Sequence, residues 1–196
     1  MDRIRVNAET GLLEPCRYLP SPNCDERPDH TDIDMIVIHN ISLPPAKFGT
    51  GAVEAFFTNT LEMAADPYYQ TISHLKVSSH LFIKRTGEMI QFVPFTKRAF
   101  HAGESFFDGK TRCNDFSIGI ELEGTDDLPY ESIQYQQLVR VIQALIEAYP
   151  SISLSRIVGH SDIAPSRKTD PGSAFDWNYL KGMLHDIYRH SDCVGD

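Results

Sequence analysis

Two histidines and an aspartate are the residues of this chain best suited to hold a metal ion. His39 ends the apolar run 35–38, whereas His160 and Asp170 both lie in the Pro- and Gly-containing segment 159–172. Two imidazoles and one carboxylate form an N,N,O ligand set. This set suits Zn²⁺ with a fourth position open to water, as in catalytic rather than structural zinc sites. The sequence therefore predicts a metal-assisted hydrolase.

Lys168 stands two residues before Asp170, where a purely structural metal site would need no cation. In an extended segment the side chains at i and i+2 point the same way, so the ammonium would face the open side of the metal. Each residue alone has a plainer interpretation, because a histidine at a strand end is more often structural and an aspartate before Pro-Gly forms turns. On composition alone, other histidines stay open as ligands: His74, His80 and His101.

Two glutamates in the segment 116–124 are candidates for general acid–base chemistry. The segment alternates with period two, which predicts a strand with Leu122 and two isoleucines on one face and Gly119, Glu121 and Glu123 on the other. Apolar surroundings would raise the carboxyl pKa of Glu121 toward the range useful for proton transfer. Glu123, nearer the strand end, is expected to be wetter. Periodicity does not choose between the two, and both have a structural alternative as ion-pair or capping residues.

The other periodicities predict a single domain of the α/β class, with a central mixed sheet and helices on both sides. A short β-branched run at 35–39 predicts a strand buried on both faces. Residues 1–32 contain several prolines and little periodicity, so we expect an irregular N-terminal wrap belonging to the same domain as residues 33–190. The remaining expected elements are a helix over 51–62, a hairpin of 80–85 with 89–93, a strand over 116–124, a helix over 138–149 ended by Pro150, a weak strand over 152–158 and a helix over 175–188.

Length and charge limit the classes of partner. A chain of 196 residues, 41% of them hydrophobic, is long enough for one full core. The net charge of −9 is spread along the chain, which argues against a nucleic acid or an anionic membrane bound through a basic face. A small anionic substrate needs only one or two local cations and stays compatible with this charge. No apolar run approaches the length of a membrane span.

The N-terminal segment and the cysteines bear on the compartment. Residues 1–9 contain no apolar core of a secretory signal, so we expect a cytoplasmic protein. The cysteines at positions 16, 24, 113 and 193 show no C-x-x-C pairing. We expect free thiols, with a Cys16–Cys24 disulfide as the less favoured alternative.

Several long motifs resemble the AmpD family of cytoplasmic 1,6-anhydro-N-acetylmuramyl-L-alanine amidases, which are related to peptidoglycan recognition proteins and phage amidases. The matching stretches are IVIHNISLPP at 36–45, KRAFHAG at 97–103, RCNDFSIGIELEGTD at 112–126, and GH…DIAP…RKTDPG within 159–172. The resemblance extends from about residue 6 to 180. It implies the peptidoglycan recognition protein-like amidase fold, with the zinc amidase domain over 33–190.

The resemblance also implies roles for individual residues. Zinc would be held by His39, His160 and Asp170, and the catalytic residues would be Glu121, rather than Glu123, and Lys168. Substrate contacts are implied near Asn40 and Arg112, and we place Lys76, Phe100 and His101 with them. In the family an arginine is common at position 76 and a tryptophan at position 100. A lysine keeps the charge of an arginine but loses its bidentate geometry.

The implied reaction is hydrolysis of the amide between the lactyl group of anhydro-N-acetylmuramic acid and L-Ala of the stem peptide, in cytoplasmic cell-wall recycling. The partner is then a small anhydro-muropeptide, without nucleic acid or membrane, and we expect a monomer. Two alternatives are a non-catalytic muropeptide-binding module, which loss of a zinc ligand would mark, and a broader-specificity amidase acting on intact peptidoglycan.

Overall fold

A six-stranded mixed sheet forms the centre of the computed structural model, which describes residues 3–192. Its strands are Arg17–Tyr18 (β3), Met35–Ile41 (β5), Leu81–Ile83 (β6), Met89–Gln91 (β7), Ser117–Glu123 (β11) and Ile157–Gly159 (β12). They lie in the order β12-β5-β11-β6-β7-β3, and all neighbours run parallel except β6 and β7. This arrangement is the mixed α/β sheet that the sequence predicts.

Strands β5 and β11 are neighbours at the centre of the sheet, and their side chains alternate between two faces. Ile36 and Ile38 of β5 share one core with Ile118 and Ile120 of β11, and apolar residues of the helix over 132–148 join them. Met35 and Val37 belong to a separate cluster on the other face. Met35 through Ile38 are fully buried, which confirms the prediction of a strand buried on both faces.

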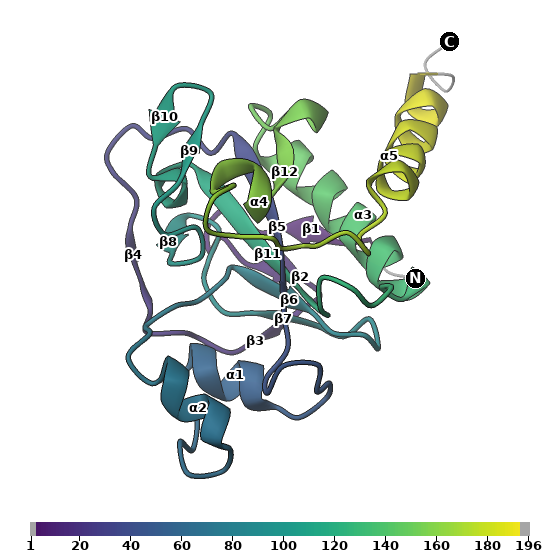
Figure 1. The fold of residues 1–196 in the computed structure, drawn as a ribbon. Helices are drawn as coiled ribbons and strands as arrows, with labels where there is room; N and C mark the ends of the chain where they lie inside the picture. Colours follow the sequence, from purple (N-terminus) through teal and green to yellow (C-terminus); the bar gives the residue numbers. More distant parts are fainter. Residues whose placement is uncertain (1–2, 193–196) are drawn as a thin grey trace.

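The helices lie around this sheet, and two short ones lie together at one end of the molecule. Their bounds are Ala52–Phe57 (α1), Pro67–Ile72 (α2), Ser132–Ala148 (α3), His160–Ile163 (α4) and Trp177–Asp192 (α5). Figure 1 shows α1 and α2 together at one end of the molecule, apart from α3 and α5. Helix α3 begins where the Glu131 N–H donates to the side-chain oxygen of Gln134, half of a capping box, and it ends before Pro150.

A predicted helix and a predicted strand end well inside their expected bounds. Helix α1 ends at Phe57 rather than near residue 62, because Asn59 adopts a left-handed backbone conformation with φ of 60°, which a helix does not continue. The strand predicted over 152–158 is confined to β12, because Leu154–Arg156 forms a 3₁₀ turn. The final helix is confirmed as α5, although its predicted apolar positions 187 and 188 lie outside the described side chains.

The hairpin predicted for residues 80–85 with 89–93 is confirmed, with the shorter strands β6 and β7. Ile83 of β6 lies opposite Met89 of β7, and the Lys84 N–H donates to the Glu88 carbonyl. Gly87 has a φ of 84°, a conformation that favours glycine in such turns.

The N-terminal segment is more regular than predicted. Its strand β3 pairs with β7 at the edge of the main sheet. Short antiparallel pairs complete the fold: Arg5–Val6 (β1) with Leu13–Glu14 (β2), Cys24–Glu26 (β4) with Lys97–Ala99 (β8), and Phe106–Phe107 (β9) with Lys110–Thr111 (β10). Strands of two or three residues have no readable period, which is why the sequence predicts only an irregular wrap over the N-terminal segment.

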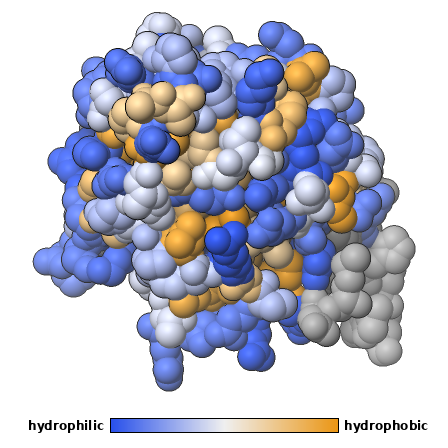
Figure 2. All heavy atoms as spheres, turned by 90° about the horizontal axis from the view of Figure 1, so that it is seen from below, coloured by the Kyte–Doolittle hydropathy of each residue, from blue (hydrophilic) through white to orange (hydrophobic). Residues whose placement is uncertain are grey.

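The surface and the cysteines agree with the composition. Among the described residues, no helix combines the length and the apolarity that crossing a bilayer requires. Figure 2 looks at the end of the molecule near α1 and α2 and shows apolar patches separated by hydrophilic side chains.

Cys16, Cys24 and Cys113 are free thiols, so the Cys16–Cys24 disulfide considered above is wrong. Cys193 lies outside the described residues.

Candidate functional site

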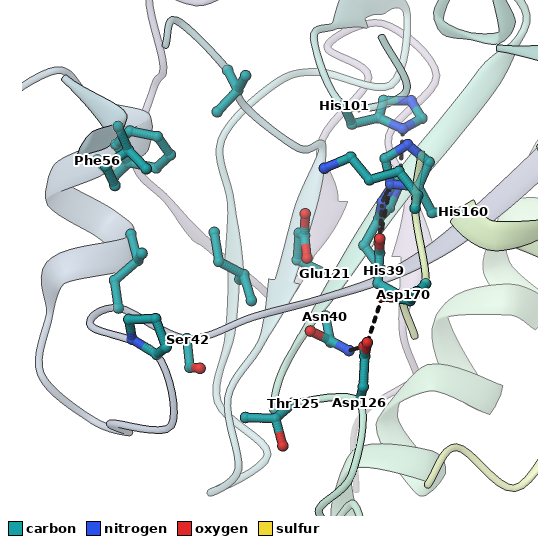
Figure 3. Close-up of a pocket in the computed structure, with 18 of the residues that line it drawn as sticks. His39, Asn40, Ser42, Phe56, His101, Glu121, Thr125, Asp126, His160 and Asp170 are labelled. Carbon is teal, nitrogen blue, oxygen red and sulfur yellow. Dashed lines mark hydrogen bonds and ion pairs between the residues drawn. The ribbon is translucent and has the colours of Figure 1, made fainter. Parts of the chain in front are cut away.

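Three side chains from separate segments converge at the predicted metal site (Figure 3). Nδ1 of His39 and Nδ1 of His160 each lie 3.0 Å from Oδ2 of Asp170, and the two nitrogens lie 3.0 Å from each other. His39 belongs to β5, and His160 begins α4 directly after β12, which pairs with β5. The parallel pairing of these two strands therefore brings the two imidazoles together.

The loop that carries Asp170 is fixed by its backbone. The Ser161 N–H donates to the Asp170 carbonyl, at 2.9 Å, and the Tyr130 hydroxyl donates to the Pro171 carbonyl, at 2.7 Å. Gly172 has a φ of 82°, and a Cβ at this position would lie 2.1 Å from the Cα of Asp126. Only glycine allows this close approach, so the Pro171-Gly172 pair seats the loop against the segment that follows β11.

Burial controls the protonation of the cluster. The side chain of His39 is 1% exposed, and burial lowers its pKa to about 4, against the hydrogen bond with Asp170, which raises it. Burial also raises the pKa of Asp170, but hydrogen bonds with His160 and His39 outweigh it and hold this pKa below its usual range. A neutral His39 and an ionised Asp170 can each offer a lone pair to a metal ion that displaces the proton of the hydrogen bond between them. The cluster of His39, His160 and Asp170 can therefore bind a metal ion.

Glu121 lies directly beside His39, because the two residues are register partners in β11 and β5. The residue is 9% exposed, and its Oε2 atom has no hydrogen-bond partner. Burial raises the pKa of Glu121 well above its usual range; the charge of Asp170 raises it further, and Lys168 opposes the shift. A buried carboxyl with a free oxygen and a raised pKa has the properties of a general base or acid.

Glu123 has a different environment, and the prediction that it is wetter than Glu121 is wrong. Glu123 is 4% exposed, because the loop at Gly49 and the hairpin at Arg85 cover this end of β11. Its carboxylate accepts hydrogen bonds from the backbone N–H groups of these two residues, at 2.5 and 3.0 Å. Glu123 therefore anchors two loops and has the structural role that the sequence left open.

A cavity of about 640 Å³ opens beside the cluster. It is lined by the three candidate ligands and by other residues singled out in the sequence: Asn40, Phe100, His101, Glu121 and Lys168. Its opposite wall is mostly apolar and comes from the loop before α1 and from both short helices: Leu43, Pro45, Phe56, Tyr68 and Ile72. The size and mixed lining are those of a small-molecule site.

The structure does not bring Lys76 and Arg112 into this cavity. Lys76 is exposed, although its neighbours Leu75 and Val77 line the cavity wall. Arg112 pairs with Asp115, at 3.3 Å, and lines a second cavity of about 470 Å³. Arg167 lines both cavities, so the second one adjoins the first.

Sequence reasoning missed Asp126, which also lines the main cavity. Its carboxylate accepts from the Asn40 amide, at 2.8 Å, and from the Thr169 hydroxyl, as Figure 3 shows for Asn40. Asp126 thus links the end of β5 to the loop of Lys168 and Asp170. Nothing in the sequence around Asp126 signals this link, because its partners are far away along the chain.

The other histidines do not compete as ligands. His80 is buried and bonded to backbone groups of Gly119 and Lys97, and His74 is exposed. His101 contacts Nε2 of His39, at 2.9 Å, on the side opposite the cluster. Within the described part of the chain, His39, His160 and Asp170 form the group able to hold a metal.

Comparisons with known proteins agree with this site. The family model described as N-acetylmuramoyl-L-alanine amidase (Amidase_2) matches residues 29–173. The chain is 56% identical to the 1,6-anhydro-N-acetylmuramyl-L-alanine amidase AmpD of Escherichia coli K12 over 176 residues, 90% of this chain and 96% of that protein.

Solved structures give the same result. The crystal structure of a selenomethionine AmpD derivative matches with a TM-score of 0.87 and 52% identity, over 89% of this chain and 97% of that one. The E. coli amidase AmiD, in complex with the substrate anhydro-N-acetylmuramic acid-L-Ala-D-γ-Glu-L-Lys, matches with a TM-score of 0.56 and 29% identity, over 92% of this chain and 65% of that one. With its sequence, its fold and a converging His-His-Asp cluster in agreement, this chain belongs to the AmpD family of N-acetylmuramoyl-L-alanine amidases.

Proposed function

We propose that this amidase hydrolyses the bond between the lactyl group of 1,6-anhydro-N-acetylmuramic acid and the L-Ala of its stem peptide, using zinc held by His39, His160 and Asp170. The observation that carries the proposal is the placement of Glu121 beside His39 in the register of two parallel strands, next to three converging ligand atoms. The identity with AmpD and the substrate bound to AmiD support the same substrate class here.

The ligand set fits zinc better than harder cations. Bonds of about 2.0–2.1 Å at tetrahedral angles would place zinc ligands roughly 3.3 Å apart, and the three ligand atoms here are separated by 3.0 Å. Two imidazole nitrogens with facing lone pairs favour zinc over Mg²⁺ or Ca²⁺, which prefer oxygen ligands. When bound, zinc supplies Lewis acidity for amide hydrolysis.

The surrounding residues divide the remaining chemistry. Glu121, with one oxygen free of hydrogen bonds, takes the proton from the attacking water and passes it to the leaving nitrogen of L-Ala. Lys168 lines the same cavity, and its ammonium neutralises the charge that develops on the amide oxygen. Glu121 is buried and Lys168 is partly buried, which limits competition from bulk water and strengthens these interactions.

The cavity walls indicate how the substrate lies. The apolar wall of α1 and α2 offers a surface for the anhydro-sugar, together with Phe100. The carboxylates of the stem peptide need cations, which Arg167, Arg112 in the adjoining cavity and the exposed Lys76 provide. Asn40 and His101 line the cavity, and their side chains also bond to protein groups. We propose that they contact the substrate through the atoms that these bonds leave open to the cavity.

A metal measurement tests the ligand assignment. The purified protein is expected to hold about one zinc per chain, and His39→Ala, His160→Ala and Asp170→Ala are each expected to lose it, because three ligands are the minimum for a tight catalytic site. His74→Ala, an exposed histidine, serves as the matched control and keeps its zinc. Stoichiometric zinc in His160→Ala by elemental analysis would contradict the assignment.

A broader-specificity amidase acting on intact peptidoglycan is the second candidate, because the matching family model is described generally as N-acetylmuramoyl-L-alanine amidase, without the anhydro sugar. Release of stem peptide from a purified anhydro-muramyl tripeptide, measured beside release from intact sacculi, separates the two. Preference for the anhydro-muropeptide supports our proposal, whereas equal rates on both substrates contradict it.

We also propose a cytoplasmic compartment and a monomeric state. The free thiols of Cys16, Cys24 and Cys113 suit a reducing compartment, in agreement with a cytoplasmic role in cell-wall recycling. The site is built from one chain, so a monomer suffices for activity. Cell fractionation and light scattering of the purified protein test these two points.

A further inference from the structure

The ring nitrogens of the two ligand histidines that face away from the cluster bond to consecutive residues of one loop. Nε2 of His39 lies 2.9 Å from Nδ1 of His101, and Nε2 of His160 lies 3.1 Å from the carbonyl oxygen of Ala102. The loop follows β8. One short segment therefore stands behind both imidazoles, on the side opposite the metal position.

These contacts determine where the ring protons lie. A carbonyl oxygen only accepts, so His160 carries its proton at Nε2 and leaves Nδ1 free for a metal. The contact between His39 and His101 joins two ring nitrogens, and either could donate. The direction of this hydrogen bond follows from the partner of the other ring nitrogen of His101.

That partner is Ser117. Its hydroxyl lies 2.6 Å from the Cys113 carbonyl, to which it can only donate, and 3.2 Å from Nε2 of His101. With its proton used, the hydroxyl accepts from the Nε2–H of His101. Nδ1 of His101 then carries a lone pair and accepts from the Nε2–H of His39. Nδ1 of His39 is left unprotonated, facing Asp170.

The ring of His101 is held in place from two sides. A Cβ on Gly119 would lie 2.4 Å from Cγ of His101, so the ring packs directly on the backbone of β11. The side-chain oxygen of Asn114 accepts from the backbone N–H groups of His101 and Ala102, at 3.1 and 2.8 Å. Gly119 lies between the two isoleucines of β11, and this close packing of the His101 ring explains why a glycine stands there.

We propose that His101 is a positioning residue that fixes the tautomer and orientation of His39, through a chain of hydrogen bonds from His39 to His101, Ser117 and the Cys113 carbonyl. This inference rests on the proposed zinc site. It differs from the substrate contact that the sequence suggested for His101. Partners of this kind behind a ligand histidine typically change metal affinity by about 10- to 100-fold.

Zinc affinity measured by chelator competition tests the role of the acceptor. His101→Phe keeps the ring volume but removes the acceptor, and we expect zinc binding to weaken by about 10- to 100-fold. His101→Asn places an amide oxygen near the position of Nδ1, so most of the affinity should return. Melting temperatures of the metal-free variants measure any general loss of packing. Equal affinities for wild type and His101→Phe, or equal losses in both variants, would overturn the proposal.

The wild-type protein provides a test that does not depend on variants folding. In ¹⁵N NMR of the zinc-loaded protein, we expect protons on Nε2 of both His39 and His101, with scalar coupling across the hydrogen bond between the two rings. A proton on Nδ1 of His101 would overturn the proposal. If the protein binds no zinc, the proposed function fails, whereas the tautomers of the metal-free protein still test the hydrogen-bond chain.

Discussion

Glu121 and Glu123 point to the same face of β11 and differ in what their carboxylates meet. One oxygen of Glu121 is buried without a partner, whereas Glu123 accepts from two backbone N–H groups. The alternation of the strand identifies both residues from the sequence. It does not separate them, because the covering loops come from distant segments. The carboxylate proposed as catalytic and the structural one are distinguished by their hydrogen-bond donors.

Exchange of each glutamate should therefore have a different effect. Glu121→Gln is expected to lower kcat by roughly 100-fold or more, the scale of general acid–base catalysis, with zinc still bound. Glu123→Ala removes the acceptor of two partly buried hydrogen bonds, worth about 0.5–1.5 kcal/mol each, so its melting temperature should fall while kcat of the folded enzyme stays within a few-fold. Steady-state kinetics and thermal unfolding measure both effects. Equal, large losses in kcat would contradict this division.

Lys168 is predicted to act mainly in the transition state. Lys168→Ala should then lower kcat and kcat/KM together with little change in KM, by about 3–4 kcal/mol, as for other oxyanion donors. Lys181→Ala, which removes an exposed lysine of α5, is the matched control and should leave both constants unchanged. A raised KM with kcat preserved would show that Lys168 instead grips a substrate carboxylate.

At the scale of elements, the loop of Lys168 and Asp170 depends on a link that no single strand or helix provides. Asp126 bonds to Asn40 at the end of β5 and to Thr169 within the loop, and its own backbone packs on Gly172. The link joins a central strand to the loop that supplies one candidate ligand. The position of Asp170 is therefore set by Asp126 as well as by its own turn.

Removal of this link should weaken metal binding without removing a ligand. Asp126→Ala is expected to lower zinc affinity by about tenfold or more, as for other residues that orient ligands. Asp127→Ala removes the same charge from an exposed neighbour that also lines the cavity, and it should keep wild-type affinity. Chelator competition on the two variants measures the difference, and equal affinities would show that the loop holds its shape without Asp126.

The elements that could be predicted from the sequence are those with a period long enough to recognise. The buried run of β5, the alternation of β11, the hairpin at Gly87 and the spacing of α3 each follow from local patterns. The position of Arg112 could not be predicted, because Arg112 itself adopts a left-handed backbone conformation, with φ of 60°, directly before the 3₁₀ turn Cys113–Asp115. Helix α2 could not be predicted, because Tyr69 is its one buried residue and the segment therefore shows no apolar stripe, whereas α1 buries four residues.

For the whole molecule, the buried carboxyl of Glu121 opposes folding of the metal-free protein at neutral pH. Its pKa in the folded state lies well above the ordinary value of 4.5, so the folded state binds this proton more tightly than the unfolded chain. The stabilisation from protonated Glu121 is complete below pH 4.5 and is lost as the pH rises through the folded pKa. A glutamine at this position does not titrate.

Glu121→Gln should therefore be more stable than wild type without metal, by a margin that grows with pH. Each pH unit between the two pKa values adds about 1.4 kcal/mol, and each kcal/mol corresponds to about 2–4 °C in a protein of this size. Melting temperatures in chelator between pH 5 and pH 8 measure the margin. A margin that stays constant over this range would contradict the raised pKa.

The register of β5 and β11 restricts how this enzyme can diverge. Because His39 and Glu121 are partners in one ladder, an insertion of one residue within either strand would turn one of the two side chains to the opposite face, into the core against α3. Insertions in the segments around α1 and α2 would reshape only the apolar wall of the cavity. The proposed metal ligand and the proposed proton carrier are therefore inherited as a unit, while substrate preference is free to change through the loops.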